Sequence, residues 1–306
     1  MSGLRVIKPG PLSLLQDAGR HGWQHLGVSP AGPMDLLAAA WANRLLGNPR
    51  QCAVLEIAQG GVELEAEEAL WLAFTGADMP LLVDGEPRLN WSRLHLAAGQ
   101  RLQIGYARSG QRGYLALVDG IRADAVLGSV ACQLREGLGG LEGDGARLAV
   151  GDRLAGGSGG FPRGASVPWP WQPDYQAEQV LRVMIGGDAA TFAEAQTRAF
   201  FEQPWLLSSQ SDRMGARLQG DAMVAPQRQW SQGVVSGAIQ VPPDGQPIIL
   251  MADRQTMGGY PVLGWVHPLD LGRLAQCPAN RLLRFVAMGL EEAQDELREF
   301  YRFFGR

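Results

Sequence analysis

Acidic, basic, amide and hydroxyl side chains follow one another between residues 236 and 260, which read SGAIQVPPDGQPIILMADRQTMGGY. The apolar run IILM leads directly into Asp253, Gln255 and Thr256, and two glycines precede Tyr260. Polar groups that a rigid scaffold presents at a strand end commonly form binding sites, and glycines let the backbone approach a ligand closely. The pattern therefore predicts a site here. A polar surface turn after a core strand is the alternative interpretation.

A second polar cluster follows the apolar run PWLL. It contains Ser209, Ser211, Asp212 and Arg213, a dense set of hydrogen-bond donors and acceptors. Arginine binds carboxylates and phosphates through two parallel bonds, so Arg213 is a candidate anion-binding residue. An Asp–Arg turn with hydroxyl caps is the alternative.

Two acidic residues and an arginine near the start of the chain are further candidates. Asp17 and Arg20 follow a short apolar run, an arrangement that also fits a turn held by an ion pair. Asp35 falls in the first turn of the clearest predicted helix, where the helix dipole favours a carboxylate with or without a site role. Asn43 lies two turns later and projects from a different face.

Several catalytic motifs are absent from the sequence. The single lysine, Lys8, lies in a Lys-Pro-Gly turn, and no GxxxxGK[ST], no GxSxG nucleophile elbow between a strand and a helix, and no strand-linked GxGxxG occurs. The four histidines have no metal-ligand spacing, and the three cysteines lie far apart without a CxxC pair, so no metal site is expected. The remaining candidate groups are carboxylates and arginines, together with amide and hydroxyl side chains. Such a set can bind and polarise a small carboxylate or amide. An Asp would act as general base if burial raised its pKa.

Composition places the chain among globular proteins of ordinary polarity. Its 306 residues are 46% hydrophobic and 19% charged, with a net charge of −4, so neither nucleic acid nor an anionic membrane surface is an expected partner. The N-terminus lacks an apolar signal core, and no apolar run is long enough to span a bilayer. A cytoplasmic location with free thiols is therefore expected.

Short apolar runs separated by turns predict a mainly β fold with a few helices (α+β). The runs in residues 53–150 have the spacing of barrels and sandwiches, and helices are expected near 33–46, 188–200 and 290–304. A glycine- and proline-rich stretch predicts a linker at 161–178 between an N-terminal lobe, 1–160, and a C-terminal lobe with a terminal helix, 179–306.

A set of linked motifs along the chain resembles one known family. They are QDAGR (16–20), GPMD (32–35) with Asn43, SDRMG (211–215), QVP from Gln240, GQP around Gln246, and DRQT (253–256) with GGYP (258–261). In this order they resemble the allophanate-hydrolase-subunit-2-like family, also called the KipA or biotin-dependent carboxyltransferase-like family. Within it, the nearest resemblance is to C subunits of bacterial ATP-dependent 5-oxoprolinases. Met257 departs from the pattern, since relatives usually carry a second threonine there.

The resemblance implies a two-lobed, cyclophilin-like β-barrel architecture and a heteromeric complex. The implied partners are a KipI-like B subunit and an A subunit of the LamB/YcsF type, which together open 5-oxo-L-proline to L-glutamate with ATP used at the level of the complex. The implied catalytic residues are Asp35, Asp253 and Arg213. The implied substrate-binding residues, for a small lactam or amide, are Asp17, Arg20, Asn43, Ser209, Ser211, Asp212, Gln240, Gln246, Gln255, Thr256 and Tyr260.

Two other functions share the same fold. One is a carboxyltransferase like that of urea carboxylase, which would bring in biotin as cofactor. The other is a KipA-type binder that antagonises a KipI-like kinase inhibitor and performs no chemistry.

Overall fold

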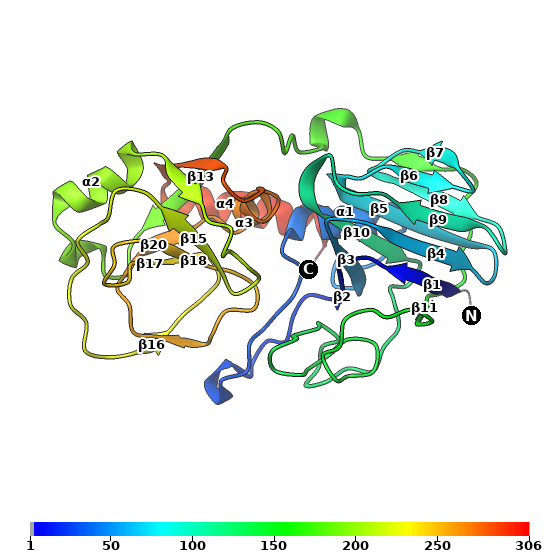
Figure 1. The fold of residues 1–306 in the computed structure, drawn as a ribbon, viewed down its shortest axis with the longest axis horizontal. Coiled ribbons are helices and arrows are strands. Elements are labelled where there is room, and N and C mark those ends of the chain that lie inside the picture. Colours follow the sequence, from blue (N-terminus) through cyan, green and yellow to red (C-terminus); the bar gives the residue numbers. More distant parts are fainter. Residues whose placement is uncertain (1–2, 306) are drawn as a thin grey trace. The chain divides into compact units, whose positions relative to one another are not determined.

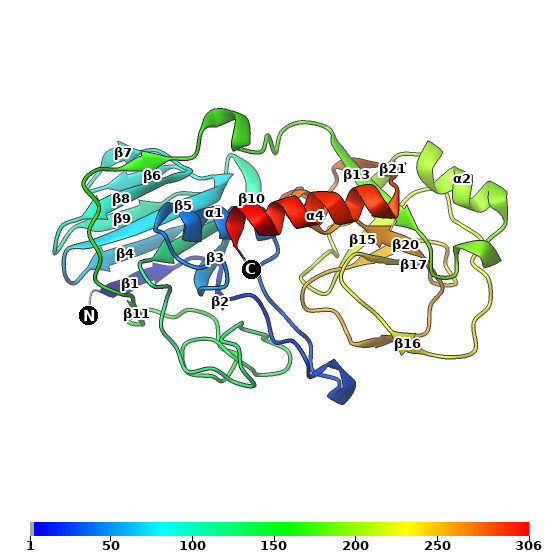
Figure 2. The ribbon, with the colours of Figure 1, turned by 180° about the vertical axis from the view of Figure 1, so that it is seen from behind.

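The computed structural model describes residues 3–305, which are built mainly from strands (Figures 1 and 2). They form two units: residues 3–20, Ala31–Gln176 and 303–305 make the first, and His21–Pro30 with Ala177–Arg302 the second. The helices are α1 (Leu36–Leu45), α2 (Glu194–Glu202), α3 (Pro268–Ala275) and α4 (Leu290–Phe304), with 3-10 turns η1 (Gln24–Leu26), η2 (Trp169–Trp171) and η3 (Ala189–Thr191). The predicted fold class, mainly β with a few helices in a two-part β architecture, is confirmed.

Two six-stranded sheets form the first unit. One has the order β11 (Arg153–Ala155), β1 (Gly3–Pro9), β4 (Val62–Ala66), β9 (Arg101–Ile104), β6 (Leu81–Val83), β7 (Glu86–Arg88). The other has the order β12 (Ala165–Ser166), β8 (Ser92–Leu96), β5 (Leu70–Asp78), β10 (Ser109–Leu117), β3 (Val54–Ala58), β2 (Leu12–Gln16). All of the neighbouring strands for which a register is resolved run antiparallel.

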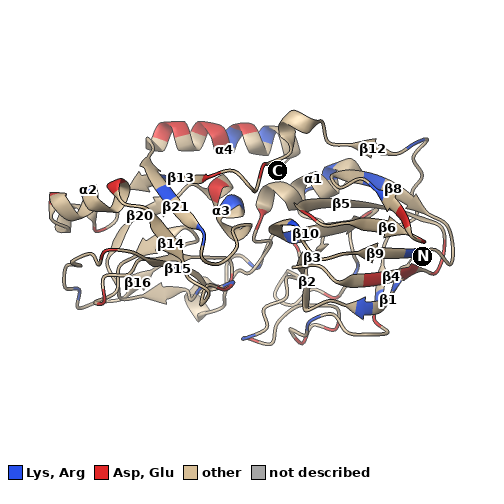
Figure 3. Cartoon of the chain, turned by 45° about the horizontal axis from the view of Figure 1, so that its top comes forward, with Lys and Arg blue, Asp and Glu red and all other residues tan. Residues whose placement is uncertain are grey.

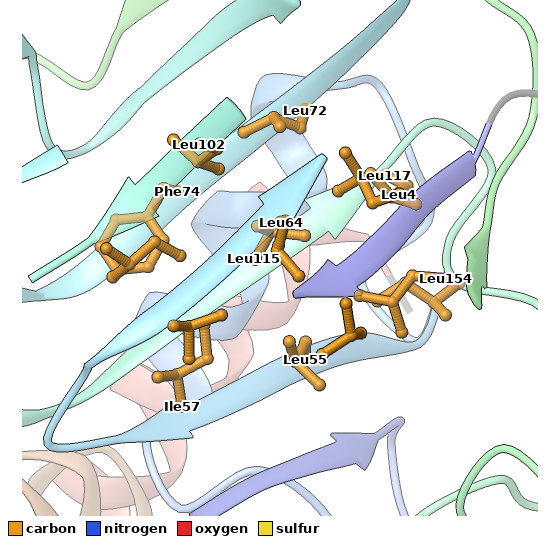
Figure 4. Close-up of a cluster of buried hydrophobic side chains, with 14 of the residues drawn as sticks. Leu4, Leu55, Ile57, Leu64, Leu72, Phe74, Leu102, Leu115, Leu117 and Leu154 are labelled. Atoms are coloured by element: carbon orange, nitrogen blue, oxygen red, sulfur yellow. The ribbon is translucent and has the colours of Figure 1, made fainter. Parts of the chain in front are cut away.

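The two sheets enclose the main core of this unit (Figure 4). Leu64 and Leu102 come from one sheet, and Leu72, Phe74 and Leu115 from the other, all with no more than 1% of their surface exposed. Successive strand residues point to opposite faces, so the intervening residues of β5 and β10 face away from this core. Burial on both faces explains why residues 70–74 of β5 and 114–117 of β10 read as continuous apolar runs.

The outer face of the second sheet is covered by α1. Ala38 and Trp41 of the helix pack with Ala73, Tyr114 and Ala116, the alternate residues of β5 and β10. Small alanines let the helix lie close to the sheet, and Phe303 and Phe304 pack edge-on against Trp41. Helix α1 is thus held by burial on two sides.

The second unit is a closed barrel. Its strands follow the order β13 (Gln179–Ile185), β20 (Val262–Val266), β17 (Ala238–Gln240), β18 (Ile248–Leu250), β15 (Gly215–Gln219), β14 (Trp205–Leu207), β21 (Leu282–Ala287). Closure comes from β13 and β21, which pair in parallel, whereas the other barrel pairs are antiparallel. A short ribbon of β16 (Gln232–Gly233) and β19 (Met257–Gly258) stands outside the barrel.

Arg182 of β13 ties two helices to the barrel. Its guanidinium bonds to Asp270 of α3 at 2.8 Å and to Glu296 of α4 at 2.6 Å. These carboxylates raise the pKa of Arg182, the hydrogen bond to Asp270 being the largest cause. Figure 3 shows acidic residues in the first part of α4 and basic ones near its end, the distribution that a helix dipole favours.

Residues 161–176, most of the predicted linker, pack on the first unit. β12 pairs with β8, and Val167 and Tyr175 are buried against the α1 cluster. The structure divides the units between Gln176 and Ala177, and it also assigns His21–Pro30 to the second unit and 303–305 to the first. The division thus falls inside the range 161–178 predicted as a linker, and composition reveals the turns of this segment but not the few apolar anchors that hold it.

Candidate functional site

A pocket of about 300 Å³ opens on the outer face of the barrel, where β15, β17 and β18 lie side by side. This volume is at the lower end of the range for small-molecule sites. The lining combines an apolar floor with charged, amide and phenol groups: Asp212, Met214, Gly215, Arg217, Gln240, Pro242, Asp244, Ile248, Leu250, Gln255 and Tyr260.

Strand register explains why these residues meet. Ile248 of β18 is paired with Arg217 of β15 on one side and Gln240 of β17 on the other. Paired residues of neighbouring strands project from the same face, so the three side chains form one row across the sheet. A cation and an amide therefore flank an apolar centre.

The turn from β17 to β18 is fixed by its own residues. Asp244 Oδ1 accepts a hydrogen bond from the Gln246 N–H at 3.0 Å, and Gly245 has a φ of 74°. A Cβ at Gly245 would lie 2.3 Å from the carbonyl oxygen of Met223, so the turn requires glycine. This turn places Asp244 at the pocket edge.

The Gln240 side chain is unusual in being buried without a partner. It is 1% exposed, and its Nε2 has no hydrogen-bond acceptor among the described residues. An unsatisfied buried donor costs about 1–3 kcal/mol, and a ligand acceptor in the pocket would remove this cost. Gly258 leaves room for this amide, because a Cβ there would lie 2.3 Å from Nε2.

Asp212 and Arg217 bring opposite charges to the same wall. Asp212 Oδ1 accepts hydrogen bonds from the N–H groups of Met214 and Gly215, which fixes the carboxylate. Arg217 forms no ion pair with any described residue, and its side chain is exposed. A small molecule with both a proton donor and an anionic group would find a complement to each.

Arg213 and Asp253, two of the predicted catalytic residues, form one buried ion pair. Arg213 Nε and Nη2 donate to the two carboxylate oxygens of Asp253 at 2.8 Å each, and the Asp253 N–H donates to the Arg213 carbonyl oxygen. Neither lines the pocket. The pair joins the segments that carry Asp212 and Gln255, so it positions the wall.

Four of the other predicted site residues of the second unit line the pocket: Asp212, Gln240, Gln255 and Tyr260. The rest do not line it. Gln246 bonds in both directions with the backbone of Gly220, and Ser211 Oγ accepts from the Arg217 N–H. Thr256 is buried, with its carbonyl oxygen bonded to Val234, and Ser209 is exposed.

The predicted site residues near the start of the first unit form hydrogen bonds with its backbone. Arg20 is fully buried and donates to the carbonyl oxygens of Val126, Ser129 and Ala131, and burial lowers its pKa. Asp17 accepts from the Val130 N–H at 2.9 Å in the same loop.

Asp35 and Asn43 have similar roles in the first unit. Asp35 is the N-cap of α1, accepting from the Ala38 N–H at 3.0 Å and from the Tyr175 hydroxyl at 2.8 Å. Asn43 bonds to the carbonyl oxygens of Arg50 and Cys52 beyond the end of that helix.

Asp35 also borders a buried acid–phenol pair. Tyr114 donates to Glu56 Oε2 at 2.7 Å and accepts from the Asp35 N–H. Burial raises the pKa of Tyr114 well above its ordinary value, and the nearby Glu56 carboxylate adds to this. The phenol therefore stays protonated and serves as a fixed donor.

Sequence reasoning did not single out Arg217 or Asp244 as site residues. Arg217 belongs to a strand in which exposed and buried residues alternate, and only the pairing of that strand with β18 shows that it faces Gln240 across Ile248. Asp244 lies in the turn between β17 and β18, and its position at the pocket edge likewise depends on tertiary structure.

Metal and membrane sites are not found in the described part of the chain. No group of three or more His, Cys, Asp or Glu side chains among residues 3–305 is arranged to hold a metal ion. Each helix in the same residues is too short or too polar to cross a bilayer.

A family model described as the carboxyltransferase domain, subdomain A and B, matches residues 26–287. The chain belongs to this carboxyltransferase family, which confirms the resemblance drawn from the motifs. The C subunit of the 5-oxoprolinase of Escherichia coli (strain K12) is 38% identical over 311 residues, spanning 98% of this chain and 96% of that protein.

Longer proteins also contain a similar region. A putative urea carboxylase of Emericella nidulans is 30% identical over 98% of this chain but 26% of its own length. The solved structure of the Kluyveromyces lactis urea carboxylase aligns with a TM-score of 0.90 over 99% of this chain and 29% of that one, at 24% identity. The structural likeness shows the shared fold.

Proposed function

We propose that this chain is the C subunit of a cytoplasmic, ATP-dependent 5-oxoprolinase. With a KipI-like B subunit and a LamB/YcsF-type A subunit, it would hydrolyse 5-oxo-L-proline to L-glutamate. The observation that carries the proposal is the 38% identity to the C subunit of a 5-oxoprolinase over nearly the full length of both proteins.

The barrel pocket fits the chemistry of a small cyclic amide acid. The substrate would carry one lactam group and one carboxylate, and the pocket offers an unused amide at Gln240 and an unpaired guanidinium at Arg217. In this assignment, the Gln240 amide bonds to the lactam and Arg217 binds the carboxylate, with Ile248 beneath the ring. Asp212 is then placed to accept the lactam N–H.

Amide resonance makes a lactam carbonyl a poor electrophile, which explains a requirement for ATP. Conversion of the carbonyl oxygen to a phosphate ester would make the ring carbon open to attack by water. ATP is assigned to the complex as a whole, and this chain's residues are proposed to bind and orient the lactam. Arg213 and Asp253 act on the reaction by holding the pocket wall, whereas Asp35 and Asn43 stabilise the first unit by holding α1.

Carboxyl transfer is the second candidate. The family description and the 30% identity to a putative urea carboxylase favour it, because urea is also a small amide that Gln240 could recognise. In that case biotin would carry the carboxyl group.

The deciding experiment measures glutamate release from 5-oxoproline and ATP by this chain mixed with its cognate A and B subunits. Arg217→Met removes the pocket cation, and Arg198→Met, which breaks an exposed ion pair with Glu194 on α2, is the matched control. The proposal expects activity that needs all three chains and a KM raised at least about tenfold by Arg217→Met alone.

Absence of glutamate from a well-folded complex would refute the oxoprolinase assignment. Transfer from carboxybiotin to urea would then support the second candidate. If the chain binds a KipI-like protein but supports neither glutamate release nor carboxyl transfer, its function would be that of a KipA-type antagonist.

A further inference from the structure

A cation without a counter-charge is buried in the second unit. Arg254 is 6% exposed, and no carboxylate lies within ion-pair distance of it among the described residues. The other well-buried arginines of this unit differ: Arg213 pairs with Asp253 at 2.8 Å, and Arg228 with Asp188 at 2.8 Å. Arg254 is also absent from the lining of the barrel pocket.

The partners that Arg254 does have are neutral and few. Nη1 donates to the Ser236 hydroxyl at 2.7 Å, and Nε donates to the Val234 carbonyl oxygen over a long 3.4 Å. A guanidinium carries five N–H bonds, so three of those of Arg254 have no acceptor in residues 3–305, and Nη2, which bonds to none of these residues, is accessible from solvent. Burial lowers the pKa of Arg254 to about 10, which still leaves the side chain charged at neutral pH.

Such an arrangement gives the Arg254 charge little stabilisation within the protein, which an anion at its accessible edge would add. A buried charge is normally paired, because desolvation removes the water that would stabilise it. The backbone around Arg254 is nevertheless fixed, since the Val234 N–H donates to the Thr256 carbonyl oxygen and Ser236 bonds to that of Met251. Two fixed hydrogen bonds to Arg254 hold the guanidinium in one orientation with its other donors unused.

We propose that Arg254 is the core of an oxyanion-binding site outside the barrel pocket, taking a phosphate or carboxylate group through the unused edge of its guanidinium. The planar fork of arginine matches both groups in a bidentate geometry. The Arg254 site lies close to the barrel pocket, because Val234 connects the two. The Val234 carbonyl oxygen accepts the hydrogen bond from Arg254. The Val234 side chain lies beside Gly258, which faces the Gln240 amide of the pocket. The site does not depend on the proposed lactam chemistry.

The test measures anion binding by this chain alone. Inorganic phosphate, acetate and chloride at equal ionic strength are titrated by calorimetry and by thermal unfolding. Phosphate, acetate or both should bind and raise Tm more than chloride does. The anion that gives the response shows whether the site takes a phosphate or a carboxylate group. Arg254→Met, which keeps length and removes charge, should abolish the response, whereas Arg284→Met, at an exposed ion pair with Glu178, should retain it.

A purely structural role for Arg254 makes the opposite prediction. Arg254→Met would then lower Tm without added anions, and wild type would respond to phosphate and acetate no more than to chloride. Arg254→Lys covers the case in which the methionine variant does not fold. It retains the charge but loses the fork, so it should bind the responding anion at least about tenfold more weakly. Unchanged affinity in Arg254→Lys, or no oxyanion response in wild type, would overturn the proposal.

Discussion

Arg213 and Asp253 meet through two parallel hydrogen bonds of 2.8 Å, with both side chains less than a tenth exposed. The residues lie 40 positions apart, and the pair joins the turn after β14 to the segment after β18. Both segments contribute to the pocket, so this contact connects the stability of the barrel to the shape of the site.

Removal of either partner should therefore destabilise the second unit. Arg213→Leu or Asp253→Leu is expected to cost about 3–5 kcal/mol, since each leaves a buried charge unpaired, while the double variant should cost less than the sum. Urea unfolding of the four proteins, followed by barrel tryptophan fluorescence, measures this cycle. Single variants of near wild-type stability that still lose glutamate release would instead make Arg213 or Asp253 a direct participant.

Gly258 should control the pocket through Gln240. In Gly258→Ala the new Cβ would lie 2.3 Å from Gln240 Nε2 and must displace the amide, so substrate affinity should fall about tenfold or more with the fold retained. Gly233→Ala is the matched control, because Gly233 lies on the partner strand with no atom within 4 Å of its Cβ position. Equal KM values in the two variants would show that Gln240 does not contact substrate.

Asp35 should matter for stability rather than chemistry. Asp35→Ala removes the N-cap of α1 and an acceptor of the Tyr175 hydroxyl, so a loss of about 2 kcal/mol is expected. Turnover per folded complex should stay close to wild type in assays at low temperature. A large fall in kcat with unchanged KM and full folding would restore Asp35 as a catalytic residue.

Cys277 should make stability depend on alkaline pH. Burial raises its pKa from 9.0 to about 12, so the unfolded chain ionises first, and its stabilising contribution is complete below pH 9 and is lost as pH rises towards 12. Cys277→Ala should flatten the fall of unfolding free energy over that interval. The native thiol should also resist iodoacetamide at pH 8 and react once urea is added. Rapid alkylation of Cys277 in the native protein at pH 8 would contradict this.

The sequence predicted the fold class and several pocket residues because local signals carried them. Gln255 and Tyr260 follow an apolar run and glycines, and Asp212 lies in a polar turn, all visible without tertiary structure. Arg217 was not singled out, because its neighbours across the sheet depend on register, which the order of residues in one strand does not reveal. Arg213 and Asp253 were predicted as separate functional groups for the same reason, since nothing local shows that their charges neutralise each other.

The segment 161–176 shows a second limit of prediction from sequence. Val167 and Tyr175 are isolated anchors in a glycine- and proline-rich stretch, too sparse to give a periodic pattern, yet both are buried. Composition therefore indicates the turns of this segment but not that residues 161–176 pack on the first unit.

The parallel pairing of β13 with β21 has a consequence for biosynthesis. The two strands begin about a hundred residues apart along the chain, and no hydrogen-bonded neighbour completes the barrel until β21 has emerged from the ribosome. The earlier strands must wait with an open edge, a state that invites pairing with other chains. Production of this protein should accordingly benefit from slow translation, low temperature or a holding chaperone.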